Sequence, residues 1–364
     1  MIKRGSIISI ILMVLTLSSG FALEQVTLEE VILEAKANNS NVLILDEQIK
    51  YSSWLTTETK AVAEDLMDDL FNAPSDQRYG LAQKVYIEPL RASFQSKNLN
   101  LEKISLLKQL ESQATGAYFE LLDSEEALLQ AKYDVTVAQK DEAAKKLMFE
   151  MGRVAKIDYD KAVFTREQME RSLTAYERSI ELSYIKLNEI MSRSPYDRYD
   201  LVKPALTVDL PVIEDIPEAV ENYRLNSLEF IKQLEALDLA EEVYEITSNF
   251  STDRSTRMQA DRDREMESFK LDAAKRSADY EFRIEYNNLL NQYDTFLSAY
   301  GRYSISVKTY EIAKLKYDRG MITAVEFLKE ASTHESIRRE RQAALHSFNN
   351  AKTSFITKFE IYKD

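Results

Sequence analysis

The sequence predicts an all-α protein made of two tandem long-helix hairpin repeats, with little or no β-structure. The chain of 364 residues has only 7 glycines and 6 prolines, while 30% of its residues are charged. Globular α/β folds need a Gly- or Pro-rich turn about every 10 to 15 residues. No proline occurs from Leu90 to Ser194 or after Pro217, so the helices must be long.

A glycine-centred pattern occurs twice, which indicates an internal duplication. The segments Lys146–Tyr159 and Lys314–Phe327 carry the same arrangement of aromatic, apolar and acidic residues, and they are 168 residues apart without a gap. Each pattern separates two long segments without proline. We therefore expect Gly152 and Gly320 to form the turns at the tips of two helical hairpins.

The composition excludes several classes of function. A net charge of −14 disfavours nucleic acid as a partner, because phosphate binding needs clustered Lys and Arg. The absence of cysteine excludes disulfides, zinc–cysteine sites and a lipid-anchored N-terminus. His334 and His346 lie too far apart on one helix to share a metal. No catalytic triad, phosphate loop or HExxH motif occurs, so we expect neither an enzyme nor a bound cofactor.

Residues 1–22 have the layout of a secretory signal peptide. Two basic residues are followed by an apolar run, Ile7–Leu17, and by small residues at Gly20 and Ala22. The run is short for a membrane span, although an uncleaved anchor is the alternative. Cleavage before Leu23 would bring the net charge to about −16. The sequence therefore predicts an exported protein of the cell envelope, in the periplasm or the outer membrane.

The first repeat is expected to cover residues 23–194 and to begin with two helices. Thr27–Asn38 reads as a short amphipathic helix, in which Thr27 and Glu30 form a capping box. Asparagines break the pattern before a second helix, Val42–Phe71. Arg78–Pro89 is the one stretch that looks extended, with partial alternation of apolar residues, and it predicts one short strand or a loop.

A long helix, Leu90–Met151, follows, because its leucines recur at spacings of 3, 4 and 7. Its roughly 60 residues would span about 90 Å. After the turn at Gly152, a second helix returns over Asp158–Arg193. Residues 195–216, which are rich in proline, are expected to form an extended linker.

The second repeat, residues 217–364, restarts the same plan. It opens with a short helix near Ile216–Val220, followed by a helix over Leu228–Ser248, the polar stretch Asn249–Arg264, a long helix to Arg319 and a final helix after Gly320. The second and returning helices of each repeat together match the length of the long helix. We expect them to cover it end to end, and we expect so thin a protomer to oligomerise.

These features resemble the TolC-type outer-membrane efflux factors over about residues 27 to 360. The duplication and its spacing carry the resemblance, together with a tip pattern of aromatic, glycine, apolar and acidic positions. The pattern occupies Phe149, Gly152, Val154, Ile157 and Asp158 in the first repeat, and Tyr317, Gly320, Ile322, Val325, Glu326 and Phe327 in the second.

The resemblance implies three protomers that form a hollow helical cylinder, completed in the outer membrane by a β-barrel of four strands per protomer. A membrane-spanning strand needs about 9–11 residues of alternating character. Residues 72–89 hold at most one short strand, and residues 248–275 are too charged to face lipid. The chain therefore resembles a divergent member of the family with reduced or missing strands.

The resemblance also assigns candidate residues at the tips. Contact with a periplasmic adaptor protein is expected at Gly152, Arg153, Val154, Gly320, Met321 and Ile322. Charges at a pore entrance are expected at Asp158, Glu326 and Arg319. For the two carboxylates the alternative is a role at the start of a helix, where the dipole favours negative charge, and for Arg319 it is a solvated surface position.

The function that follows from the resemblance is a passive export conduit. A homotrimer would accept substrates from a periplasmic adaptor and an inner-membrane transporter. The alternative is an exported helical spacer or scaffold protein of the envelope without a transport lumen.

Overall fold

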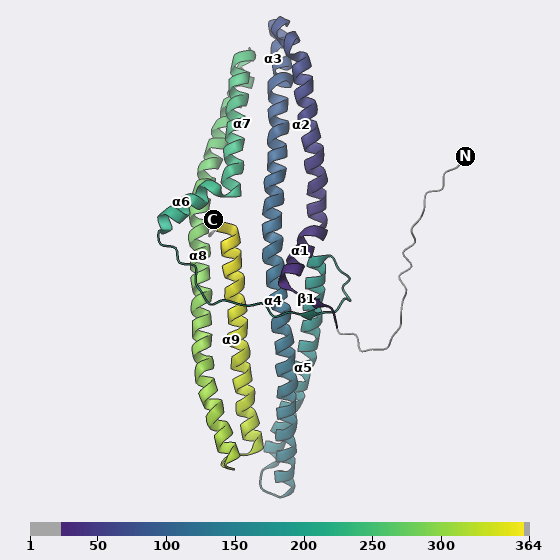
Figure 1. Cartoon of the computed structure of the whole chain (residues 1–364), viewed down its shortest axis with the longest axis vertical. Coiled ribbons are helices and arrows are strands. Elements are labelled where there is room, and N and C mark those ends of the chain that lie inside the picture. Colours follow the sequence, from purple (N-terminus) through teal and green to yellow (C-terminus); the bar gives the residue numbers. More distant parts are fainter. Residues whose placement is uncertain (1–22, 360–364) are drawn as a thin grey trace, which may run out of the picture.

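The computed structural model describes residues 23–359, which form two long helical hairpins lying side by side (Figure 1). The first hairpin and its accessory helices contain these elements: β1 (Gln25–Val26), α1 (Leu28–Asn38), α2 (Ser40–Asn72), α3 (Ser75–Ala82), a π-helix η1 (Gln83–Ile87), α4 (Glu88–Glu150), α5 (Lys156–Met191) and β2 (Asp200–Leu201). The second contains these: α6 (Ile216–Asn226), α7 (Leu228–Phe250), α8 (Arg254–Asp318) and α9 (Ala324–Phe359).

The predicted end-to-end packing is confirmed. In the first hairpin, α2 and α5 both pack against the 63-residue helix α4. In the second, α7 and α9 both pack against the 65-residue helix α8. Contacts of α4 with α9 and α7 join the two hairpins. The protomer is therefore long and thin, and α4 and α8 are the two long helices against which the others pack (Figure 1).

Each hairpin buries an apolar stripe at helical spacing. On α4, Tyr118, Leu121 and Leu122 are buried against α1 and α5. On α8, Phe282, Leu289 and Phe296 recur every seven residues and are buried with phenylalanines of α9. A spacing of seven residues returns side chains to nearly the same helix face. These stripes therefore decide which face of α4 and which face of α8 is covered by the other helices.

Beta structure in the described residues is limited to one pair of two-residue strands. Gln25 pairs with Asp200 and Val26 with Leu201, in parallel register. The Tyr118 hydroxyl donates to the carbonyl oxygens of Val26 (3.0 Å) and Val202 (2.5 Å). This contact ties both short strands to the middle of α4. The chain then crosses to the second hairpin at mid-height (Figure 1).

The prediction of a strand or loop over Arg78–Pro89 is wrong. The segment forms α3, the π-helix η1 and the first turn of α4. Val85 and Ile87 are both buried, at 4% and 1% exposure. Residues two apart lie on nearly opposite sides of a helix, but η1 is in contact with α2, α4 and α7, so both side chains are buried. In the sequence this spacing imitates a strand.

The polar stretch 249–264, for which no helix was expected, is mostly helical. Helix α8 begins at Arg254, where the Asp253 carboxylate accepts a hydrogen bond from the Thr256 backbone N–H at 2.8 Å. An Asp at this position is a strong N-cap. The predicted capping box of Thr27 and Glu30 is present at the start of α1. The predicted signal peptide lies outside the described residues.

Candidate functional site at the hairpin tips

The first tip is a tight turn closed by backbone hydrogen bonds. Gly152 has φ 71°, its N–H donates to the Phe149 carbonyl at 2.8 Å, and the Arg153 N–H donates to the Met148 carbonyl at 2.8 Å. These two bonds define a Schellman motif, which satisfies carbonyls at the end of α4. The motif needs a left-handed residue, a conformation that glycine adopts without a steric penalty.

The second tip repeats this geometry. Gly320 has φ 68°, its N–H donates to the Tyr317 carbonyl at 2.8 Å, and the Met321 N–H donates to the Lys316 carbonyl at 2.8 Å. Both tips lie at the same end of the molecule, the lower end in Figure 1. The two glycine patterns therefore form equivalent turns, side by side at one end.

An aromatic pair closes each hairpin behind its turn. Phe149 stacks on Tyr159 with ring centroids 6.0 Å apart and planes within 9°. At the equivalent positions, Tyr317 stacks on Phe327 at 5.0 Å and 8°. Each pair links the last turn of the outgoing helix to the first turn of the returning helix, so it holds the tip in one shape.

The outer surface of both tips is rich in apolar side chains. Met321 is 67% exposed and Ile157 is 59% exposed. Arg153 is also exposed, whereas Val154 and Ile322 are half-buried. The structure thus gathers the candidate adaptor residues of each hairpin on its own tip, on a surface that is apolar with scattered positive charge.

The three candidate pore-entrance charges have different surroundings. The Glu326 carboxylate accepts bonds from the Thr323 backbone N–H (2.7 Å) and hydroxyl (3.0 Å), which completes a capping box at the start of α9. These bonds from Thr323 lower the pKa of Glu326 below its ordinary value. Asp158 lies half-buried in the first turn of α5, whose N-cap Ala155 offers no side-chain bond. Arg319 is exposed at the end of α8.

Comparison with solved structures assigns the fold. The chain matches VceC, an outer membrane protein of Vibrio cholerae, with a TM-score of 0.65 and 10% identity, covering 91% of this chain and 95% of that one. A membrane protein of Pseudomonas aeruginosa matches with a TM-score of 0.64 and 11% identity, over 93% and 91% of the two chains. The CmeC outer membrane channel of Campylobacter jejuni matches with a TM-score of 0.60 and 13% identity, over 91% and 85%.

The chain has the fold of a TolC-type outer-membrane channel protomer. The resemblance predicted from the duplicated tips is thereby confirmed for the fold. No family model and no curated protein matches the sequence. In residues 23–359, no helix is both long enough and apolar enough to cross a bilayer.

Within this TolC-type fold, the contact between the hairpins holds residue pairs that sequence reasoning missed. The ring of His346 on α9 is buried, stacks on Phe119 of α4 at 4.8 Å and lies 2.6 Å from the Asp123 carboxylate. Lys329, near the tip, pairs with Asp141 of α4 at 3.1 Å. No local sequence signal relates residues more than 180 positions apart, so these pairs become visible only in the fold.

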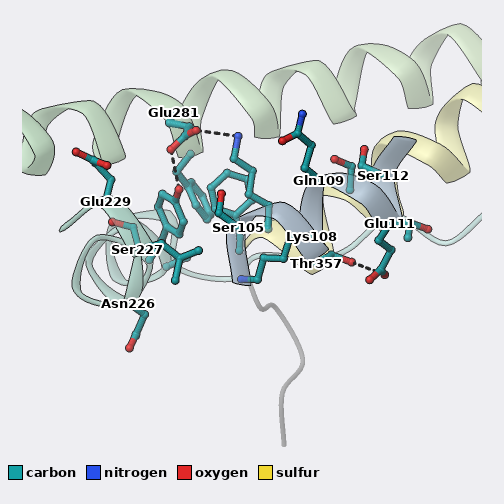
Figure 2. A pocket seen from close by; sticks show the side chains of 18 of the residues that line it. Ser105, Lys108, Gln109, Glu111, Ser112, Asn226, Ser227, Glu229, Glu281 and Thr357 are labelled. Atoms are coloured by element: carbon teal, nitrogen blue, oxygen red, sulfur yellow. Dashed lines mark hydrogen bonds and ion pairs between the residues drawn. The ribbon is translucent and has the colours of Figure 1, made fainter. Parts of the chain in front are cut away.

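A cavity of about 700 Å³ lies between α4, α6, α8 and α9 (Figure 2). On its α8 side, Glu281 accepts from Tyr223 at 2.6 Å and pairs with Lys358 at 2.8 Å. On its α4 side, Thr357 donates to Glu111 at 3.3 Å. The lining mixes both signs of charge with hydroxyl groups. In the part of the chain that the structure describes, no three His, Asp or Glu side chains converge as a metal site.

Proposed function

We propose that the protein is a passive export conduit, a homotrimeric helical tube that accepts substrates from a periplasmic adaptor and an inner-membrane transporter. The observation that carries this proposal is the pair of equivalent tips at one end of a TolC-type protomer. A repeated, rigid and apolar end surface is suited to docking a partner of matching symmetry. Transport along the tube requires no catalytic group in this chain.

The exposed side chains of α2 support self-association. The inner face of this helix is covered by α4. Its outer face carries Ile44, Tyr51 and Val62, which are 54%, 63% and 40% exposed. Their spacings of 7 and 11 residues place them on one stripe. An apolar stripe along a thin protomer indicates a surface that a second helix covers, as expected for a closed tube.

The mass of the purified mature protein tests whether it forms the proposed trimeric tube. Mass photometry at micromolar concentration in a mild detergent should give one species of three times the protomer mass. A protein that remains strictly monomeric up to that concentration would overturn the conduit proposal.

Charge reversal at the tips tests adaptor docking. We expect Arg153→Glu combined with Arg319→Glu to reduce capture of the adaptor and export of a fluorescent dye from cells by roughly tenfold or more, since each abolished docking contact of about 1.4 kcal/mol is a tenfold change. Lys140→Glu, an exposed charge on the shaft of α4, is the matched control and should leave both unchanged. If both variants reduced adaptor capture and dye export equally, the tips would not be part of the docking surface.

The second candidate function is an exported helical spacer or scaffold without a lumen. It is favoured by the helical end opposite the tips, where α3, η1 and the start of α8 lie. The two functions differ in a planar bilayer containing the purified oligomer. A conduit gives stepwise conductance and supports dye export in cells, whereas a spacer gives neither.

A further inference from the structure

The cavity between the hairpins lies where two helices of the second hairpin are stacked end to end. Helix α9 reaches Phe359 and α7 begins at Leu228, and both of these residues line the cavity. Both helices pack along α8. The opposite wall of the cavity belongs to α4, so the space of about 700 Å³ is open to groups from both hairpins (Figure 2).

The equivalent joint in the first hairpin is closely packed. Helices α1 and α6 have 11 residues each and begin 188 residues apart, at Leu28 and Ile216. On α1, Val31 and Ala35 are both 0% exposed and are packed among residues of α4 and α5. The residues at the same positions of α6 line the cavity instead: Ala219 and Tyr223. The duplicated chain thus has one filled joint and one joint with a cavity.

The charged side chains on the two walls are paired within the chain. On the α4 side, Glu111 pairs with Lys36 at 2.5 Å. On the α8 side, Glu281 pairs with Lys358 at 2.8 Å. The other two charged residues of the lining have opposite signs: Lys108 and Glu229. No single sign of charge dominates the cavity, so its lining favours an uncharged ligand.

Neutral hydrogen-bonding side chains face the cavity from both hairpins. On α4 they are spaced four and three residues apart, which places them on one helix face (Figure 2): Ser105, Gln109 and Ser112. Three more come from α9: Asn350, Thr353 and Ser354. Within residues 23–359, none of these six side chains forms a hydrogen bond. Their donors and acceptors can therefore bind a ligand that fills the cavity.

Asn350 gives the most specific indication. Its side-chain oxygen Oδ1 is buried and accepts no hydrogen bond from the described residues. A buried oxygen of this kind is unfavourable without a donor. A ligand that carries an N–H group beside a carbonyl would supply a donor for Asn350 and an acceptor for a neighbouring amide such as that of Gln109.

One wall of the cavity is aromatic. Tyr223, Phe282 and Phe359 line it from α6, α8 and α9. The ring of Phe359 lies 4.4 Å from that of Tyr223 and 4.9 Å from that of Phe282, between centroids. The Tyr223 hydroxyl donates to Glu281 at 2.6 Å, which fixes the ring. Aromatic rings beside hydroxyl and amide groups suit a ligand that has both an apolar C–H face and many neutral polar groups.

We propose that this cavity binds an uncharged saccharide that carries an acetamido group. The sugar hydroxyls match the serine and threonine side chains, the acetamido group matches Gln109 and Asn350, and the C–H face of the sugar ring lies against the aromatic wall. The volume is within the range of small-molecule sites, about 300–1,000 Å³. The cavity is formed within one chain, so this binding goes beyond the proposed conduit and does not depend on it.

Two sugars of the same size test the ligand class. N,N′-Diacetylchitobiose carries two acetamido groups, whereas cellobiose has hydroxyls in their place. In isothermal titration calorimetry with the purified protein, diacetylchitobiose should bind with a dissociation constant in the millimolar range or below. Cellobiose should bind about tenfold more weakly or worse, because it leaves the two amides without partners. Equal affinities would overturn the acetamido assignment, and no binding of diacetylchitobiose would overturn the site.

Variants of exposed residues test the location. Ser105 is exposed at the edge of the cavity, and Ser105→Trp should fill it and abolish binding. Gln109→Leu should weaken binding of diacetylchitobiose about tenfold. Ser298→Trp is the matched control, because Ser298 is exposed on α8 outside the cavity, and it should bind as the wild type does. Circular dichroism checks that each variant folds. Unchanged binding in Ser105→Trp would place the sugar elsewhere and overturn the proposal.

A free sugar and the end of a polymeric glycan share the same chemistry. Sedimentation with insoluble chitin separates these sources. Protein that sediments with chitin and is released by diacetylchitobiose recognises polymer ends. Protein that stays in solution, yet binds the disaccharide in the calorimeter, recognises the free sugar. Sedimentation that diacetylchitobiose does not compete, or that Ser105→Trp retains, would contradict binding in this cavity. A monomeric protein that passes these tests would overturn the conduit and leave the saccharide site standing.

Discussion

At the residue scale, Gly152 and Gly320 are the points on which the tips depend. They are the glycines of residues 23–359 that have a positive φ, at 71° and 68°, and no neighbouring atom lies within 4 Å of the position of an added Cβ. A side chain would therefore meet no steric obstacle from other residues. Its cost would come from the backbone alone, because a left-handed conformation brings Cβ close to the following carbonyl oxygen.

Replacing either glycine with alanine should destabilise its hairpin. For Gly152→Ala or Gly320→Ala we expect a loss of about 1–2 kcal/mol in the free energy of unfolding, measured by urea denaturation. Gly80→Ala is the control, because Gly80 is helical, exposed and equally unobstructed. That variant should gain up to about 1 kcal/mol. Tip variants as stable as the wild type would show that the turns relax to another conformation.

At the scale of elements, the sequence predicted the long helices well because little in it can end a helix. Gly152 and Gly320 were visible as turns, and the N-cap of α1 was visible as a capping box. The misread segment contains Val85 and Ile87, whose burial depends on the helices α2, α4 and α7 that surround η1. A π-helix is stabilised by tertiary packing rather than by local propensity, so the pattern of the segment alone pointed to a strand.

The hydrogen bonds between Tyr118 of α4 and the region of the short strands are a second feature that only the fold reveals. Burial raises the pKa of Tyr118 to about 12, so its hydroxyl remains a donor at neutral pH. It donates to the carbonyl oxygen of Val26 in β1 and to that of Val202, which directly follows β2. Its equivalent in the second repeat, Tyr286, packs on Phe355, and its hydroxyl makes no hydrogen bond to the described residues. Tyr118 and Tyr286 therefore occupy equivalent positions in the two repeats but make different contacts.

Removing one hydroxyl should loosen the strand pair. We expect Tyr118→Phe to cost about 1–3 kcal/mol, since it removes the hydroxyl donor of the Val202 carbonyl oxygen and one of the two donors to the Val26 carbonyl oxygen. Hydrogen exchange of the Val202 amide, which donates to Val26 at 3.0 Å, should become faster by a corresponding factor. Tyr286→Phe is the matched control and should change neither quantity. If Val202 exchanges at the same rate in both variants, the strands are held by other contacts.

At the scale of the whole molecule, a nearly buried carboxylate joins the two hairpins. Glu126 of α4 has a side chain only 12% exposed, and it pairs with Lys203 of the crossing segment at 2.6 Å and with Arg338 of α9 at 2.7 Å. Burial opposes its charge, but the bonds from Lys203 and Arg338 outweigh this and keep its pKa below the ordinary value. The two partners lie 77 and 212 residues away from Glu126 in the sequence, so no local pattern indicates these ion pairs.

Glu126→Gln should therefore weaken the coupling between the hairpins. Hydrogen bonds to charged groups contribute about 1.5–3 kcal/mol, and we expect a loss of this size at pH 7, with unfolding that broadens or separates into two transitions in calorimetry. Because the folded-state pKa is depressed, the contribution of Glu126 is complete above about pH 4.5 and is lost as the pH falls through the folded-state pKa. The difference between wild type and variant should shrink over that acidic range.

Glu120→Gln, which breaks an exposed pair with Lys186 at 2.6 Å, should cost no more than about 1 kcal/mol and leave a single transition. An equal loss in both variants would mean that the hairpins are coupled by their apolar contacts alone.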